Sequence, residues 1–258
     1  MDMGIAGLRV LVTAGAAGIG LGIARAFVRE GAKVHVCDVD KDALAAVKQS
    51  DPKISQSVCD VADRAAVAKL FDIAIAELGG LDVLVNNAGI GGPTGRVEEI
   101  HPDDWDRCVA VCLTGQFNCA RLAVPHLRKS KNASIVNLSS AAGKFGFSLR
   151  TPYAAAKWGV IGFTKSLSIE LGGDGIRVNA ILPGIVAGDR QRRVLEAKAQ
   201  QLGLSYKDME ARAFSFTSIK QYITAEQLAD QIVFIVSPRG RTISGQAISV
   251  DGDTGMLS

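Results

Sequence analysis

A tyrosine and a lysine four residues apart, Tyr153 and Lys157, are the residues whose types and spacing most clearly suggest chemistry. Pro152 favours a helix start just before them, and residues four apart on a helix share one face. A phenol, with an ordinary pKa of about 10, is a poor base at neutral pH, but a nearby ammonium stabilises its phenolate. Ser140 follows an expected strand upstream, where its hydroxyl can hydrogen-bond an oxygen on which charge develops. These side chains predict acid/base chemistry at an alcohol or carbonyl oxygen.

A glycine-rich turn follows the first expected strand and precedes a stretch with helical apolar spacing. It contains Gly15, Gly18, Ile19 and Gly20. Glycine permits close backbone approach there, and the N–H groups at the positive end of the helix favour a pyrophosphate. A simple tight turn would have the same composition. We predict that this turn binds a dinucleotide.

Asp38 stands at the carboxyl end of the second expected strand, directly after residues 33–37 and eighteen positions beyond Gly20. A carboxylate at that spacing accepts hydrogen bonds from the adenosine ribose and repels a 2′-phosphate. The neighbouring Ala17 and Val39 offer no cation that would compensate such a phosphate. Asp38 could instead cap the next helix, although Asp40 is better placed for that role. We therefore predict NAD rather than NADP as the cofactor.

The composition excludes several other functions. The 258 residues are 48% hydrophobic, with mean hydropathy +0.20, net charge +3 and 5% aromatic residues. Without a run of like charges or an aromatic platform, nucleic acid is not an expected partner. We find no apolar leader and no uninterrupted apolar stretch of membrane length, so we expect a cytoplasmic protein that does not enter a membrane.

The cysteines argue against disulfides and metals. Five are present, Cys37, Cys59, Cys108, Cys112 and Cys119, an odd number without a CxxC pair. Cys108 and Cys112 are four apart on an expected helix, where core packing is a better interpretation than metal binding. We expect reduced thiols and no metal site.

Short β-branched runs alternate with longer helical patterns along the whole chain. Several of these runs lack apolar/polar alternation, so they read as parallel strands buried on both faces. The pattern predicts an α/β fold of one domain, residues 1–258, with a doubly wound, mostly parallel, seven-stranded sheet of Rossmann type. The expected strands are residues 9–13, 33–37, 54–58, 81–85, 134–138, 177–182 and 247–250.

Between Gly188 and Tyr222 the sequence becomes polar and rich in charge. This stretch is too long for an ordinary connection between the last two strands. We call residues 188–222 the lid segment and predict a mobile cover over the site. The alternative is two surface helices with solvated faces.

Four motifs in order resemble the short-chain dehydrogenase/reductase family: the glycine turn, Asn86-Asn87-Ala88-Gly89, Ser139-Ser140, and Tyr153 with Lys157. The resemblance spans nearly the whole chain. It implies that Ser140, Tyr153 and Lys157 are catalytic, that Lys157 also holds the nicotinamide ribose, and that the protein is a homotetramer. It further implies contacts from Asp60 and Val61 to the adenine, a cofactor floor of Asn87, Ala88 and Gly89, and Pro183, Gly184 and Val186 beside the nicotinamide.

Some of these residues have plausible structural roles instead. Asn87 could satisfy buried backbone groups at a strand end, and Pro183-Gly184 could be only a turn.

Three positions depart from the family pattern. Cys112 stands where the family usually has an asparagine that helps to connect the lysine to solvent through a water. Because a thiol is a weaker hydrogen-bonding group, we expect a retained but altered proton relay. Ala14 replaces a usual glycine, and Gly188 stands where a threonine usually helps to fix the carboxamide.

The substrate pocket should be formed by residues 141–151 and the lid segment, both of which contain cations. Arginine suits bidentate capture of a carboxylate, phosphate or sulfonate, although such side chains are often only solvated surface. With Ser140 and Tyr153, Arg150 is the best candidate for substrate binding because it lies three residues before Tyr153. The other cations are Lys144, Arg190, Arg192 and Arg193.

These features predict an NAD-dependent oxidoreductase acting on a secondary alcohol or ketone, with a small polar or anionic hydroxy compound as a candidate substrate. The alternatives are a ketone reductase of the 3-oxoacyl-carrier type and a non-catalytic NAD-binding sensor.

Overall fold

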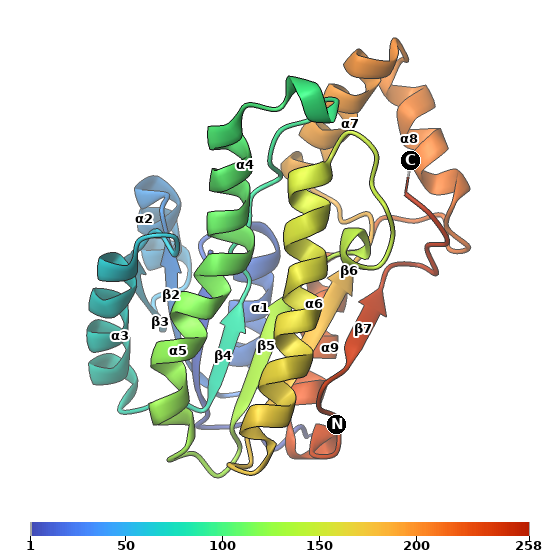
Figure 1. Ribbon diagram of the computed structural model, residues 1–258. Coiled ribbons are helices and arrows are strands. Elements are labelled where there is room, and N and C mark those ends of the chain that lie inside the picture. The colour runs from blue at the N-terminus through green and yellow to red at the C-terminus, as the bar shows by residue number, and fades with distance from the viewer. Residues whose placement is uncertain (1, 258) are drawn as a thin grey trace.

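The computed structural model describes residues 2–257, which form a sheet of seven strands with helices on both faces (Figure 1). The strand order is β3-β2-β1-β4-β5-β6-β7, and all neighbouring strands are parallel. The order reverses at β1, which confirms the predicted doubly wound fold. The strands are β1 (Arg9–Thr13), β2 (Lys33–Asp38), β3 (Ile54–Val58), β4 (Val83–Asn86), β5 (Ser134–Leu138), β6 (Arg177–Pro183) and β7 (Ala247–Val250).

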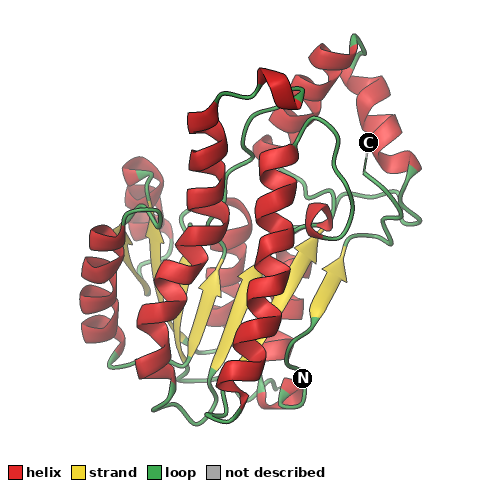
Figure 2. Cartoon of the chain, in the orientation of Figure 1, coloured by secondary structure: helices red, strands yellow, loops and turns green. Residues whose placement is uncertain are grey.

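The helices lie in two layers (Figure 2). One layer contains α1 (Gly18–Arg29), α2 (Lys41–Ser50) and α9 (Ala225–Val236). The other contains α3 (Arg64–Leu78), α5 (Gly115–Leu127) and α6 (Thr151–Gly172), with α4 (Pro102–Val109) joined to α5 through a π-helical turn, η2 (Ala110–Thr114). Shorter 3₁₀ turns are η1 (Val97–Glu99), η3 (Ala141–Gly143) and η4 (Pro238–Gly240).

The inner strands of the sheet are buried on both faces, which explains their continuous apolar runs, whereas the edge strands β3 and β7 are partly exposed. On β1, Val10 and Val12 pack with α1 and α9, whereas Leu11 packs on the other face with α3 and α5. All residues of β5 and β6 are buried. The carboxyl ends of the strands are thereby held in fixed positions by two apolar layers.

One strand begins later than the sequence predicts. We expected residues 81–85, but β4 is Val83–Asn86, and its pairing with β1 begins at Val83 opposite Val10. Asp82 is used differently: its backbone N–H donates to the carbonyl of Arg9, and its carboxylate forms an ion pair with the Arg9 guanidinium at 2.8 Å. The strands β2 and β6 are each one residue longer than expected, and the other four match.

The lid segment contains two helices, α7 (Asp189–Leu202) and α8 (Tyr206–Ser215), which lie beyond the carboxyl ends of β6 and β7 (Figure 1). Leu195 and Ala199 of α7 pack against Met209 of α8 as a separate apolar cluster. Gly188 precedes α7 with φ of +136°, a conformation that is essentially restricted to glycine. The family's usual threonine would therefore be strained at this position.

The continuous helical run Pro102–Leu127 is long and apolar enough to cross a membrane by length and composition alone, and half of its apolar window is buried inside the protein. This run packs against α3 and α6. A core helix of this kind passes the same composition test.

Candidate active site

The glycine turn follows β1 and brings backbone atoms very close together. A Cβ at Gly15 would lie 2.6 Å from the Val36 side chain, and one at Gly20 would collide with the Ala14 carbonyl oxygen. Ala14 has φ of +50°, in the left-handed region, where the family's usual glycine would have no Cβ penalty. The sequence therefore needs glycine at the two contact positions and tolerates a strained alanine beside them.

The amino end of α1 fits the pyrophosphate of a dinucleotide. Its N-cap residue, Ala17, makes no side-chain cap, and the first turn carries no acidic residue in the described chain. The first N–H groups of a helix lack intrahelical partners and favour an anion. Gly18, with φ of +51°, leaves open space beside its Cα.

Asp38 ends β2 beside this turn. Its Oδ2 accepts a hydrogen bond from the Ala16 N–H at 3.2 Å and its Oδ1 one from the Asp40 N–H. The cap of α2 is Asp40, which accepts from the N–H groups of Asp42 and Ala43, so the alternative role considered for Asp38 belongs to Asp40. Val39 is 59% exposed and brings no charge. The glycine turn therefore has a carboxylate beside it and no cation at Val39.

Asn87 has a structural role that we considered from the sequence. Its side-chain Nδ2 donates to the carbonyls of Thr13 and Ala14 at 3.0 Å, and its backbone N–H donates to the Thr13 hydroxyl. The amide therefore connects the end of β4 to the glycine turn, with buried Ala88 and half-buried Gly89 following it.

The residues expected at the adenine are also held by protein contacts. Asp60 accepts a hydrogen bond from the Ala62 N–H and pairs with Arg107 of α4 at 2.8 Å. Val61 is buried, and its carbonyl accepts from Asn118 of α5 at 3.0 Å. Both residues follow β3, on the same edge of the sheet as Asp38.

Pro183 is the last residue of β6, and Gly184 and Val186 follow it. The Gly184 N–H donates to the Val250 carbonyl at 3.1 Å, and a Cβ at Gly184 would lie 2.6 Å from the Asp251 Cα. Val186 forms a parallel bridge with Ile223. Residues 183–186 therefore pack closely against the chain at the end of β7, on the carboxyl edge of the sheet. They also adjoin the lid segment.

Tyr153 and Lys157 lie on α6, which begins at Thr151 with Pro152 in its first turn, as the sequence predicts. The Lys157 ammonium is buried, donates to the Leu138 carbonyl at 2.7 Å and lies 5.7 Å from the centre of the Tyr153 ring. Tyr153 itself is half-buried. The pair can therefore stabilise negative charge on a phenol that a ligand can still reach.

Ser140 joins β5 to η3 and contacts the same region. Its Oγ accepts from the Ala142 N–H at 3.1 Å, and η3 packs against α6. The neighbouring Ser139 donates to the backbone carbonyl of Lys157 at 2.8 Å. A Cβ at Gly143 would lie 2.6 Å from that same carbonyl, so glycine permits the close approach of this turn to α6. The turn that carries Ser140 therefore packs against the helix that carries Tyr153 and Lys157.

Cys112 lies in η2, where the helical hydrogen-bonding register changes. Its Sγ is 3.3 Å from both the N and the O of Ile90, and an added Cβ at Gly89 would meet both Lys157 Nζ and Cys112 Sγ. A hydrogen bond from Cys108 and the charge of Lys157 lower the pKa of Cys112 to about 5, against the effect of burial. The same contact and burial raise the pKa of Cys108. All five cysteines are free and buried.

Arg150 is buried, so the interpretation as solvated surface is wrong for this residue. Only 2% of it is exposed, and its guanidinium donates to the Thr94 hydroxyl at 2.9 Å and to the Gly91 carbonyl. Lys144, Arg190, Arg192 and Arg193 are exposed, as that interpretation expects. Arg150, Arg190 and Arg193 line one cavity with residues 89–92, whereas Lys144 and Arg192 do not.

Sequence reasoning missed the loop after Gly89. Gly91 and Thr94 hold Arg150, and Ile90 holds Cys112. A signal was present: the loop continues a glycine-rich stretch at the carboxyl end of β4, beside the point where the strand order reverses.

Comparison with known proteins gives the same family that the motifs suggest. A family model described as enoyl-(acyl carrier protein) reductase matches residues 14–254. The chain is 35% identical over 254 residues to a 3-oxoacyl-[acyl-carrier-protein] reductase of Thermotoga maritima, covering 97% of this chain and 98% of the relative. The chain belongs to the short-chain dehydrogenase/reductase family.

A second member of the short-chain dehydrogenase/reductase family, the 2-dehydro-3-deoxy-L-rhamnonate dehydrogenase (NAD(+)) of a Sphingomonas species, is 42% identical over 178 residues. This match covers 69% of our chain and 72% of the relative.

Two solved structures share the family fold. An NAD⁺-bound xylitol dehydrogenase aligns with a TM-score of 0.92 at 26% identity, covering 96% of this chain and 99% of that one. An actinorhodin polyketide ketoreductase variant with NADPH aligns with a TM-score of 0.90 at 31% identity, covering 94% and 95%. The short-chain dehydrogenases/reductases are nicotinamide-dependent oxidoreductases, and the two neighbours differ in which nicotinamide cofactor they hold.

Proposed function

We propose that this protein is an NAD-dependent oxidoreductase that interconverts a secondary alcohol and a ketone, with Tyr153 as the acid/base. The observation that carries the proposal is the buried ammonium of Lys157, held 2.7 Å from the Leu138 carbonyl and beside the ring of half-buried Tyr153. A phenol in that position lies beside a positive charge and remains accessible to a ligand, so it can act as the acid/base.

Each of the three residues has a distinct part in this reaction. In oxidation, the Tyr153 oxygen removes the hydroxyl proton of the substrate, and in reduction it returns one. Lys157 stabilises the phenolate form through its charge. Because the Ser140 oxygen already accepts from the Ala142 N–H, its own O–H is the group that can donate to the reacting oxygen. Bound nicotinamide would supply the hydride acceptor or donor.

NAD is the cofactor that Asp38 favours, since its carboxylate lies beside the glycine turn and no cation accompanies it at Ala17 or Val39. The NAD(+) dependence named for the Sphingomonas relative supports this choice. The residues that we propose for cofactor binding are Gly15, Gly18, Ile19, Gly20, Asp38, Asp60, Val61, Asn87, Ala88, Gly89, Tyr153, Lys157, Pro183, Gly184 and Val186.

A 3-oxoacyl-carrier ketone reductase is the alternative function. The Thermotoga relative and the description of the family model favour it. An NADPH-dependent reductase would, however, be expected to carry a cation for the 2′-phosphate, and Val39 next to Asp38 is an exposed apolar residue.

The wider assembly is part of the same proposal. We expect residues 188–222 to act as a lid on a single domain, and we expect a homotetramer in the cytoplasm. Exposed apolar side chains on α5 and α6 suit burial between subunits: Phe117 (43% exposed), Trp158 (51%) and Ile169 (84%). Free cysteines suit a reducing compartment.

The test is cofactor reduction by the whole protein with hydroxy acids, sugar acids, polyols and simple secondary alcohols, comparing NAD with NADP. We expect turnover with NAD. Asp38→Ala combined with Val39→Arg should shift the preference toward NADP by about 100-fold, because a carboxylate is replaced and a cation is added beside the phosphate.

Asp40→Ala is the matched control. It should lower stability by about 1 kcal/mol through loss of the α2 cap, without changing the cofactor preference. Turnover of the wild type only with NADP would contradict the role of Asp38, and binding of NAD without turnover of any alcohol would favour a sensor.

A further inference from the structure

The cavity beside Tyr153 is strongly cationic. It measures about 530 Å³, large enough for a small metabolite, and lies between the loop at residues 89–94 and helix α7. Arg150, Arg190 and Arg193 line it. None of its lining residues, all within the described part of the chain, is an aspartate or glutamate. Three positive charges therefore face one space without a protein anion.

Arg150 is the fixed member of this group. Its two terminal nitrogens are held by Thr94 and Gly91, its Nε has no partner within residues 2–257, and its Cζ lies 5.6 Å from the centre of the Tyr153 ring. Burying a guanidinium without a carboxylate is costly. Burial lowers the pKa of Arg150, and the charge of Arg190 lowers it further.

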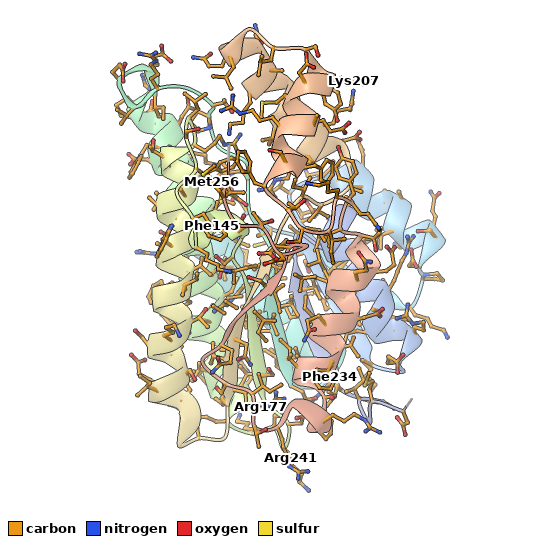
Figure 3. All side chains as sticks on the ribbon, turned by 90° about the vertical axis from the view of Figure 1, so that its right-hand side faces the viewer. Phe145, Arg177, Lys207, Phe234, Arg241 and Met256 are labelled. Carbon is orange, nitrogen blue, oxygen red and sulfur yellow. The ribbon has the colours of Figure 1, made fainter. Side chains whose placement is uncertain are left out.

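A second buried arginine shows a different arrangement. The guanidinium of Arg177, at the amino end of β6 (Figure 3), donates to the carbonyls of Ile235, Val236 and Gly240. These contacts connect β6 to the end of α9, and Arg177 does not line the cavity beside Tyr153. The contrast indicates that Arg150 faces the cavity for a reason other than packing.

Arg190 and Arg193 are the members on α7. Arg190 donates to the Gly89 carbonyl at 3.2 Å, and its Cζ lies 5.8 Å from the centre of the Tyr153 ring. The acids of this helix are engaged elsewhere, because Asp189 and Glu196 pair with Arg192 at 3.4 and 3.5 Å. The arginine side chains therefore gather at the cavity, whereas the acidic side chains of α7 lie outside it.

From this geometry we propose that Arg150, Arg190 and Arg193 form an anion subsite, and that the substrate is a hydroxy compound carrying a carboxylate, sulfonate or phosphate. This inference rests on the proposed oxidoreductase function. The guanidinium carbons of Arg150 and Arg190 lie within 6 Å of the Tyr153 ring centre, so the anion is only a few bonds from the reacting carbon. Arg150 provides the fixed contact. Arg190 and Arg193 also bind the anion and thereby draw helix α7 toward it.

The test compares matched pairs of substrates with NAD: 2-, 3- and 4-hydroxycarboxylic acids against their neutral amides, with a hydroxyalkyl sulfonate and a hydroxyalkyl phosphate as further anions. The preferred anion should have kcat/KM about 10- to 100-fold above its neutral partner. Arg190→Ala and Arg193→Ala should remove most of that preference by raising KM for the anion, with little change for the amide. The anion with the largest ratio identifies the headgroup.

Arg192→Ala is the matched control, since Arg192 lies on the same helix, is exposed and pairs with Asp189 and Glu196 outside the cavity. It should leave the preference unchanged. Equal turnover of anions and amides, or equal losses for both in the Arg190 and Arg193 variants, would overturn the subsite.

A binding measurement separates the two proposals. Calorimetric titration of the Tyr153→Phe protein in its NAD complex with the hydroxy acids requires no turnover. Binding that weakens in Arg193→Ala supports the subsite even if no compound is oxidised, in which case only the oxidoreductase function fails. Absence of anion binding by an active enzyme would reject the subsite alone.

Discussion

The carboxyl edge of the sheet and the lid segment are built in different ways, although both contact the same cavity. At the sheet edge, buried strands end in turns that are fixed by backbone and amide hydrogen bonds, such as those from Asn87 to Thr13 and Ala14. The lid segment has its own small apolar cluster. Its helix α7 contacts the segment after β4 through long polar side chains, Arg190 to Gly89 and Gln201 to Glu99, whereas residues 216–219 are joined to residues 252–255 by backbone hydrogen bonds.

This difference suggests a division of roles. The proton-transfer residues are attached to the part of the protein with the most extensive burial, where their positions vary least. The cations that would select the substrate lie partly on helices with fewer apolar contacts, where they can move.

The largest expected effect is the loss of activity when the acid/base at the sheet edge is removed. Tyr153→Phe should lower kcat by about 10³-fold, because the proton carrier is removed while the cofactor turn is unchanged. NAD affinity, measured by fluorescence titration, should change little. Tyr206→Phe removes an exposed phenol from the lid segment, where it contacts Glu210, and should leave kcat unchanged. Similar kcat losses in both variants would contradict the division of roles.

Acid should destabilise the sheet through His35. Burial lowers the pKa of His35 to about 4 from 6.5, so the unfolded chain binds more protons between those values. The free energy of unfolding should therefore fall by about 3 kcal/mol as pH drops from 6.5 to 4, and this contribution should be constant above pH 6.5.

Urea unfolding followed by tryptophan fluorescence measures this change, since Trp105 and Trp158 both lie outside the lid segment. His35→Gln should show a weaker acid dependence than the wild type. Identical pH dependence in the two proteins would show that His35 is not held in its neutral form.

Cys112→Asn tests whether the Cys112 thiol alters the proton relay beside Lys157. In the wild type, a thiol with a pKa of about 5 is negatively charged at neutral pH and loses that charge as pH falls through 5. We expect an inflection near pH 5 in kcat/KM, with a change of roughly fivefold for a charge interaction of about 1 kcal/mol. The inflection should be absent in Cys112→Asn, and superimposable profiles would reject an altered relay.

The smallest expected effect concerns backbone strain in the glycine turn. Ala14→Gly should raise the free energy of unfolding by about 0.5 kcal/mol, since relief of a left-handed alanine exceeds the added flexibility of the unfolded chain. Ala16→Gly, at a neighbour without positive φ, should instead lower stability by about 1 kcal/mol. Urea denaturation of both variants checks the prediction, and destabilisation by Ala14→Gly would contradict it.

Local pattern was enough to predict the sheet and most of its strand limits. The strands β1, β3, β5 and β7 have their expected limits because β-branched runs with turn residues at both ends specify them. The start of β4 was missed because Asp82 pairs with Arg9, which is distant in sequence. Parallel strands also bring the residues after their carboxyl ends to one edge, so Ser140, Tyr153 and Lys157 could be expected to meet.

The contacts between loops could not be predicted in this way. Burial of Arg150 depends on Gly91 and Thr94, and the ion pair of Asp60 depends on Arg107 of α4. Leu149, with φ of +63°, directly precedes Arg150, and the sequence gives no sign of that unusual conformation. Such contacts join segments whose spacing along the chain carries no periodic signal.

The most direct test of the central claim is stopped-flow measurement of NADH formation from a hydroxy acid carrying deuterium at its carbinol carbon. We predict that deuterium slows NADH formation in single turnovers and appears in the NADH, and that Tyr153→Phe binds NAD but forms NADH far more slowly. NADH formation that is equally fast in Tyr153→Phe, or that leaves the deuterium out of the NADH, would contradict hydride transfer at this site.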